Sequence, residues 1–114
     1  MEASAAASFD DFLKIDMRVG VIREVLDNEK ARKPSYKVRV YFGDVIGEKW
    51  SSVQATHYSK ESLIGRQVIA VINFPPKSIA GFTSEILIMG VPDAEGKVIL
   101  LQPDHDAVIG GRVY

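Results

Sequence analysis

The sequence of 114 residues contains no cysteine, which removes disulfide bonds, thiol catalysis and cysteine-ligated metal centres from consideration. Its longest apolar runs, such as Val68–Ile72, fall far short of the roughly 18 residues that a membrane-spanning helix needs. Residues 1–8 lack the basic and apolar regions of a signal peptide. These absences predict a soluble cytoplasmic protein without membrane insertion, whose length suits a single domain.

Motifs for catalysis or metal binding are also lacking. His105 lies between Asp104 and Asp106, but adjacent residues of a strand point to opposite faces, and no second histidine or cysteine is near. His57 follows two serines without the motif that positions a nucleophilic serine. No glycine-rich phosphate loop is present. We therefore expect no catalytic residue, no metal and no cofactor, and a protein that is not an enzyme.

The net charge of −1 conceals an uneven distribution of charge. Residues 30–78 carry nine basic and three acidic groups, whereas the segments on either side are acidic overall. From Lys30 to Phe42 there are five cations and no acid. Charge alone leaves two interpretations open, a solvated strand face and an anion-binding face.

The spacing of apolar residues predicts short strands throughout. A strand over 15–25 contains Gly20, which marks a bulge, a sharp bend or a close backbone approach, so that one strand serves two sides of a small barrel. In the strand over 36–42, alternate residues face inward and the remainder outward. The inward set is Tyr36, Val38, Val40 and Phe42, and the outward set is Lys37, Arg39 and Tyr41.

Further strands are predicted over 49–54, 67–74, 84–89 and 97–101, with a hairpin turn at 93–96 and a possible short edge strand at 112–114. Single helical turns follow Ser8, with Phe9, Phe12 and Leu13 packing on the body, and span 59–63. The fold class is all-β: a five-stranded OB-fold barrel with short helical turns and extra terminal segments, with a β-sandwich as the alternative. Residues 1–8 form a flexible N-terminal tail and 9–114 the domain.

Three motifs resemble one known family. Residues 15–22, IDMRVGVI, are similar to the opening strand of the tRNA-binding domain family, an OB-fold module appended to some aminoacyl-tRNA synthetases. Residues 73–77, NFPPK, and 79–85, IAGFTSE, resemble its second signature of Asn, Pro, a basic residue, Gly and Ser. Residues 51–56, SSVQAT, and 100–104, LLQPD, extend the resemblance to the CsaA-like secretion chaperones of that family.

The resemblance implies tRNA binding, a chaperone role on unfolded preproteins or signal peptides, and a homodimer. The dimer would form through Phe9–Leu13 and Val108–Tyr114, although these segments could instead seal the barrel ends. Cations beside an aromatic ring suit RNA. The predicted nucleic-acid-binding residues are Lys33, Lys37, Arg39, Tyr41, Lys49, Asn73, Lys77 and Ser84. For Asn73 and Ser84, capping a turn or satisfying a backbone group is an equal alternative.

One departure from the family signature points to a second ligand. The family typically carries Met two residues after the serine, whereas Ser84 is followed by Glu85 and Ile86. An acid beside a phosphate track weakens RNA binding but suits a basic or amphipathic peptide. The predicted peptide-binding residues are Phe74, Ile79, Phe82 and Glu85, with Phe74 more prone than Phe82 to be core. The alternative is a pure tRNA-binding module that acts in trans without a chaperone role.

Overall fold

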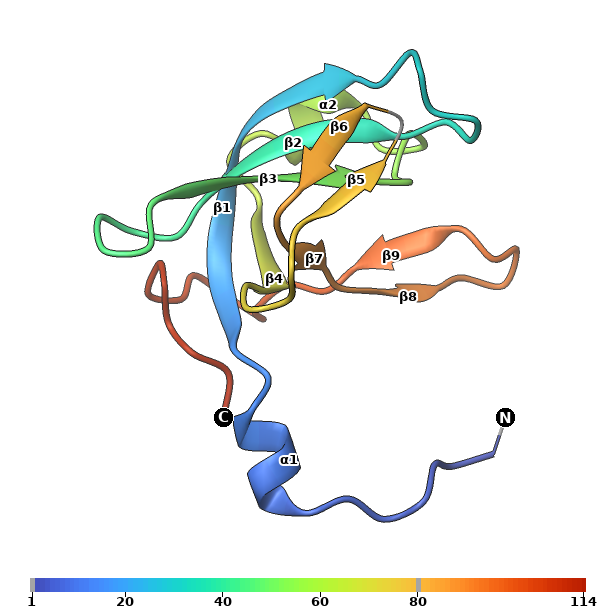
Figure 1. Ribbon diagram of the computed structural model, residues 1–114. Coiled ribbons are helices and arrows are strands. Elements are labelled where there is room, and N and C mark those ends of the chain that lie inside the picture. The colour runs from blue at the N-terminus through green and yellow to red at the C-terminus, as the bar shows by residue number, and fades with distance from the viewer. Residues whose placement is uncertain (1, 80) are drawn as a thin grey trace.

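The computed structural model describes residues 2–79 and 81–114, without the side chain of Ile79. An antiparallel sheet of order β3–β2–β1–β4–β7 curls into a nearly closed barrel, which confirms the predicted five-stranded OB-fold (Figure 1). The elements are α1 Phe9–Leu13, β1 Met17–Asp27, β2 Tyr36–Tyr41, β3 Glu48–Val53, α2 Lys60–Leu63, β4 Gln67–Val71, β5 Lys77–Ile79, β6 Phe82–Ser84, β7 Leu87–Ile88, β8 Gly90–Pro92 and β9 Val98–Leu100. Within the described residues, no helix is long and apolar enough to cross a membrane.

Strand β1 serves two sides of the barrel, as predicted. Its first half pairs with β4 and its second half with β2, and the two ladders share Val21. Gly20 lies just before that point, where a Cβ atom would stand 2.5 Å from Val40 Cγ1 and 2.7 Å from Phe42 Cε1. Of the three alternatives predicted for Gly20, the structure shows a close approach, but of side chains rather than of another backbone, while the bulge falls further on, between Ile22 and Glu24.

The core is built from the inward faces of the strands. The alternation predicted for β2 is confirmed: Val38 and Val40 are fully buried and Phe42 is 2% exposed. Leu63 of α2 belongs to the same core cluster and is also fully buried. Because apolar burial is the main favourable term in folding, this inward face fixes the register and thereby which side chains point outward.

The barrel closes between β3 and the segment that follows β6. The backbone N–H of Glu85 donates to the Trp50 carbonyl at 2.8 Å, and the backbone N–H of Trp50 donates to Glu85 Oε2 at 2.8 Å. Ser51 Oγ donates to the Ile86 carbonyl at 3.2 Å, and the Ser52 N–H donates to Ser84 Oγ at 3.4 Å. These bonds satisfy an otherwise open strand edge.

Two of the predicted strands differ from the observed ones by more than two residues at one end or are divided. The strand predicted over 84–89 is divided, because Glu85 turns both its N–H and its carboxylate toward β3 and interrupts the run between β6 and β7. The residues before it form a β5–β6 hairpin that the sequence did not predict. The strand predicted over 67–74 ends at Val71, since Asn73 instead bonds to the linker between α1 and β1.

Helix α1 lies away from the barrel, near the C-terminus (Figure 1). Ser8 and Asp11 form a capping box, as the pattern after Ser8 suggests. The expectation that the apolar side chains of α1 pack on the body was wrong for Phe9 and Leu13, which are 70% and 47% exposed. A five-residue helix on a short linker is too far from the core for both to reach it. The edge strand at 112–114 is reduced to one bridge between Arg18 and Arg112.

The close approach at Gly20 generates a stability prediction. Gly20→Ala should destabilise the fold by about 1–3 kcal/mol, because the new methyl group overpacks the side chains of Val40 and Phe42. Urea unfolding followed by circular dichroism measures this loss. Val40→Ala in the same background should recover part of it, so the two changes should couple in a double-mutant cycle. A Gly20→Ala variant as stable as the wild type contradicts the packing argument.

Candidate nucleic-acid interface

The outward face of β1, β2 and β3 presents three rows of side chains. Because residues paired across antiparallel strands point to the same side, the register determines each row. Val21, Tyr41 and Glu48 form one row, Glu24, Arg39 and Trp50 the next, and Leu26, Lys37 and Ser52 the third. The chemistry of this face changes along the strands, from the row of Tyr41 to the row of Lys37.

At the Tyr41 end, the charges are paired within the protein. The Arg39 guanidinium contacts Glu24 at 3.0 Å and also Glu48, and these hydrogen bonds raise the pKa of Arg39. The Arg23 guanidinium lies 4.3 Å from the centre of the Tyr41 ring. The Tyr41 hydroxyl donates to Asp44, and this hydrogen bond raises the pKa of Tyr41. Arg39 and Tyr41, both predicted nucleic-acid contacts, are thus committed to protein partners.

At the other end, Lys37 keeps its charge open to a ligand. Among the described residues, no carboxylate lies within salt-bridge distance of its ammonium group. The group lies 5.3 Å from the centre of the Phe82 ring, a contact worth about 0.5–1 kcal/mol at an exposed site. A cation with only an aromatic neighbour can still bind phosphate.

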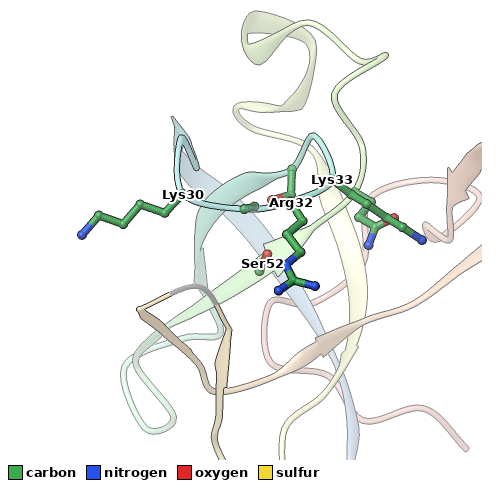
Figure 2. Close-up of a pocket in the computed structure, with 7 residues that line it drawn as sticks. Lys30, Arg32, Lys33 and Ser52 are labelled. Carbon is green, nitrogen blue, oxygen red and sulfur yellow. The ribbon is translucent and has the colours of Figure 1, made fainter.

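A basic pocket of about 500 Å³ adjoins this row, beneath the loop between β1 and β2 (Figure 2). Arg32 extends across it toward Ser52, whereas Lys30 and Lys33 point to opposite sides. Ala31, Ser35 and Gln54 complete the lining, which in the described chain contains no acid. Loop and sheet together therefore form a cationic hollow suited to an anionic polymer.

Two neighbouring pockets extend this hollow into a track. One, of about 380 Å³, shares Lys33 and Gln54 with it and reaches Lys97 beside the turn between β8 and β9. The other, of about 290 Å³, shares Ser52 and reaches Lys77 of β5, and it is also lined by the acid Glu85 and by Phe74. We call this surface the basic track; its cations are Lys30, Arg32, Lys33, Lys77 and Lys97.

The structure brings only part of the predicted nucleic-acid set together. Lys33 and Lys77 line the basic track and Lys37 stands at its margin, but Lys49 pairs with inward-facing Val40 and so lies on the other side of β3. The Asn73 amide donates to the Lys14 carbonyl at 2.7 Å and accepts from the Asp16 N–H at 2.9 Å.

Ser84, the other polar signature residue, is buried in the barrel closure and hydrogen-bonded to Ile86 and Ser52. Ser84 therefore matches its structural alternative, whereas Asn73 has a structural role other than the predicted turn cap, since it bonds to the backbone of the linker before β1.

Sequence reasoning overlooked Lys30, Arg32 and Lys97 of the basic track and Trp50 beside it. Lys30 and Arg32 belong to the acid-free run that the charge count had found, but only Lys33 was selected from that loop. Trp50 could have been placed by extending the alternation of β2 to β3, which sets it opposite Arg39 on the outward face.

The predicted peptide-binding residues are divided between two pockets. Phe74, 42% exposed, lines the pocket below Pro75 together with Glu85 and with Leu87, which is 51% exposed. Phe82 lines a different pocket, where its ring contacts Trp50. The side chain of Ile79 lies outside the described part of the structure. In that part, no three histidine, aspartate or glutamate side chains gather as a metal site would require.

Residues 17–112, almost the whole barrel, match the family described as "Putative tRNA binding domain". This chain belongs to the tRNA-binding domain family. The predicted resemblance is thereby confirmed.

Methionine--tRNA ligase of Porphyromonas gingivalis is 36% identical over 107 residues, which are 93% of this chain but only 15% of the ligase. The chain therefore spans a small part of the curated relatives that it matches.

Solved structures of CsaA chaperones are similar over nearly the whole chain. The CsaA chaperone protein from Picrophilus torridus is 50% identical with a TM-score of 0.90. Chaperone CsaA from Bacillus anthracis is 45% identical with a TM-score of 0.88. Each comparison covers 96% of this chain and 100% of the other. Similarity to the CsaA-like group, which the motifs indicated, is confirmed by these structures.

Proposed function

We propose that this tRNA-binding domain protein binds tRNA non-enzymatically through the basic track and Lys37. The observation that carries the proposal is the concentration of cations around Ser52, on the face and beside the loop that OB-folds use for nucleic acids. The similarity to methionine--tRNA ligases covers only 15% of the ligase, so their catalytic activity is not inferred for this chain. A tRNA ligand implies a cytoplasmic location.

Binding in this proposal is electrostatic and reads the shape of the RNA. Lys and Arg side chains neutralise phosphates and release counterions, whatever the base sequence. The charge of Arg39 is already balanced by two carboxylates, so most of the attraction comes from the basic track and Lys37. The basic track crosses a loop and a sheet of the protein rather than following one β-strand. Such a surface suits a folded RNA better than a straight RNA duplex.

The test is the salt dependence of tRNA binding. Replacing Arg32, Lys33 and Lys37 together by Gln should lower tRNA affinity at low salt and reduce the slope of log affinity against log salt by about two to three. Filter binding across a potassium chloride series measures both quantities. Lys49→Gln, on the other side of β3, is the matched control and should leave the slope unchanged. If the triple variant has the same slope of log affinity against log salt as the wild type, the proposal is refuted.

A second candidate function, polypeptide binding as an export-related chaperone, is favoured by one pocket. Phe74 and Leu87 are about half exposed there, beside Pro75 and the Glu85 carboxylate. Apolar walls next to one acid fit an extended segment that combines apolar and basic residues, such as the start of a preprotein. The two similar solved proteins, from Picrophilus torridus and Bacillus anthracis, are named as CsaA chaperones.

Suppression of preprotein aggregation tests this second function. The wild-type protein should slow light scattering by a denatured preprotein after dilution, and Phe74→Ser with Leu87→Ser should abolish the effect because the apolar walls are lost. Val45→Ser, at a fully exposed position outside the pocket, is the control. If the wild type does not delay aggregation, or the double variant matches it, the pocket has no such role.

We also infer that two copies of the chain associate through α1 and the C-terminal segment. Phe9 is 70% and Val108 79% exposed, so each leaves apolar surface without cover in the single chain. Light scattering coupled to gel filtration should give twice the chain mass, and Phe9→Asp with Val108→Asp should give one chain mass. Val45→Asp controls for added charge. A monomeric wild type would refute this interface.

A further inference from the structure

Two aromatic rings form a corner on the outer surface of the barrel. Trp50 of β3 and Phe82 of β6 meet at 85° with their centroids 6.0 Å apart. Leu26, Lys37, Thr83 and Glu85 join them around a pocket of about 400 Å³, which we call the aromatic corner. The volume falls within the range of small-ligand sites.

The position of this pair distinguishes it from a core contact. Both rings are only partly buried, and Trp50 belongs to the outward row of Glu24 and Arg39 rather than to the inward row of Ser51. Perpendicular aromatic pairs are favourable wherever they form, so geometry alone assigns no role. Here, however, the pair borders an open pocket, and Lys37, for which the described part of the chain offers no carboxylate within salt-bridge distance, stands at its rim.

We propose that the aromatic corner binds one unpaired nucleobase of the RNA that the basic track holds. This inference rests on the proposed function and names the part of the RNA that one site takes. The base would stack on one ring with its edge against the other, and Lys37 would contact the adjoining phosphate. Lys37 is paired across the strands with Ser52, which lines the basic track, so one bound chain can reach both.

Glu85 gives the corner a preference among bases. One carboxylate oxygen, Oε2, accepts from the Trp50 N–H, and a carboxylate has further acceptor sites. Glu85 lines the corner, and its Oε1 atom has no hydrogen-bond partner among the described residues, so we expect a base edge with an amino group to donate to it. Cytosine presents an N4 amino donor, whereas uracil presents the O4 acceptor at the same position. The corner therefore favours cytosine over uracil, two bases of similar size and stacking surface.

Trp50 is the only tryptophan of the chain, so its fluorescence reports on the corner alone. Short single-stranded oligocytidylate should quench the emission, and an abasic oligomer with the same number of phosphates should not. Oligouridylate should bind several-fold more weakly than oligocytidylate. Phe82→Leu should weaken quenching by oligocytidylate about tenfold, because one stacking wall is lost. Val45→Ala, at a fully exposed apolar position outside the corner, is the control and should quench like the wild type.

The outcomes separate this inference from the proposed function. If tRNA is retained on filters at low salt but base-containing and abasic oligomers affect Trp50 emission equally, the nucleobase site is refuted while tRNA binding stands. Equal affinity for oligocytidylate and oligouridylate overturns the role of Glu85. If tRNA is not retained at any salt concentration, the proposed function fails first. Phe82→Leu must keep the wild-type circular dichroism spectrum, and Trp50→Leu, tested by filter binding of oligocytidylate, should show the same tenfold loss without relying on fluorescence.

Discussion

The reciprocal hydrogen bonds between Glu85 and Trp50 hold the barrel closed, and the arrangement of the outer surface depends on them. Both bonds are 2.8 Å long, and the carboxylate supplies the partner that the Trp50 N–H lacks at the edge of β3. A hydrogen bond to a charged group contributes about 1.5–3 kcal/mol, and an edge N–H left unsatisfied has a comparable cost. By fixing residue 85 against β3, the pair also sets β6 beside Trp50, and Glu85 lines both the pocket of Phe82 and the pocket of Phe74.

The electrostatics of the surface follow from which cations have partners. Five basic residues between 30 and 42 suggest a uniform positive stretch, but Arg39 is enclosed by Glu24 and Glu48 on the neighbouring strands. The effective field is therefore displaced toward the loop between β1 and β2, where Arg32 crosses toward Ser52. Local pairing, rather than the number of charges along the chain, decides where a polyanion is attracted.

The sequence predicted the elements whose rules are local. Alternation identified β2 and its buried face, the Ser8 pattern identified the cap of α1, and Gly20 marked a close approach. Properties that depend on distant partners were not visible. Asn73 binds backbone groups 57 and 59 positions away, and Glu85 binds a strand 35 positions away.

The face of a side chain was predictable only where the strand register was already known. Lys49 was grouped with Lys37 by charge, but its pairing with Val40 sets it on the inward side. The same register places Trp50 on the outward face. Without the pairing of β2 with β3, Lys49 was therefore grouped with Lys37, and Trp50 was overlooked. A resemblance to a family supplies the fold and the ligand class, but it does not show which alternate residues of a strand face outward.

The shared position of Glu85 constrains how two ligands can use one small barrel. Glu85 lines both the pocket of Phe74 and the aromatic corner. Because one oxygen is committed to the Trp50 N–H, the carboxylate cannot rotate toward one ligand without opening the barrel edge. Each pocket therefore has a fixed acceptor rather than an adaptable one. A rigid acceptor favours a ligand that brings its donor to a defined place, as a stacked base does, over a flexible chain that must be ordered on binding.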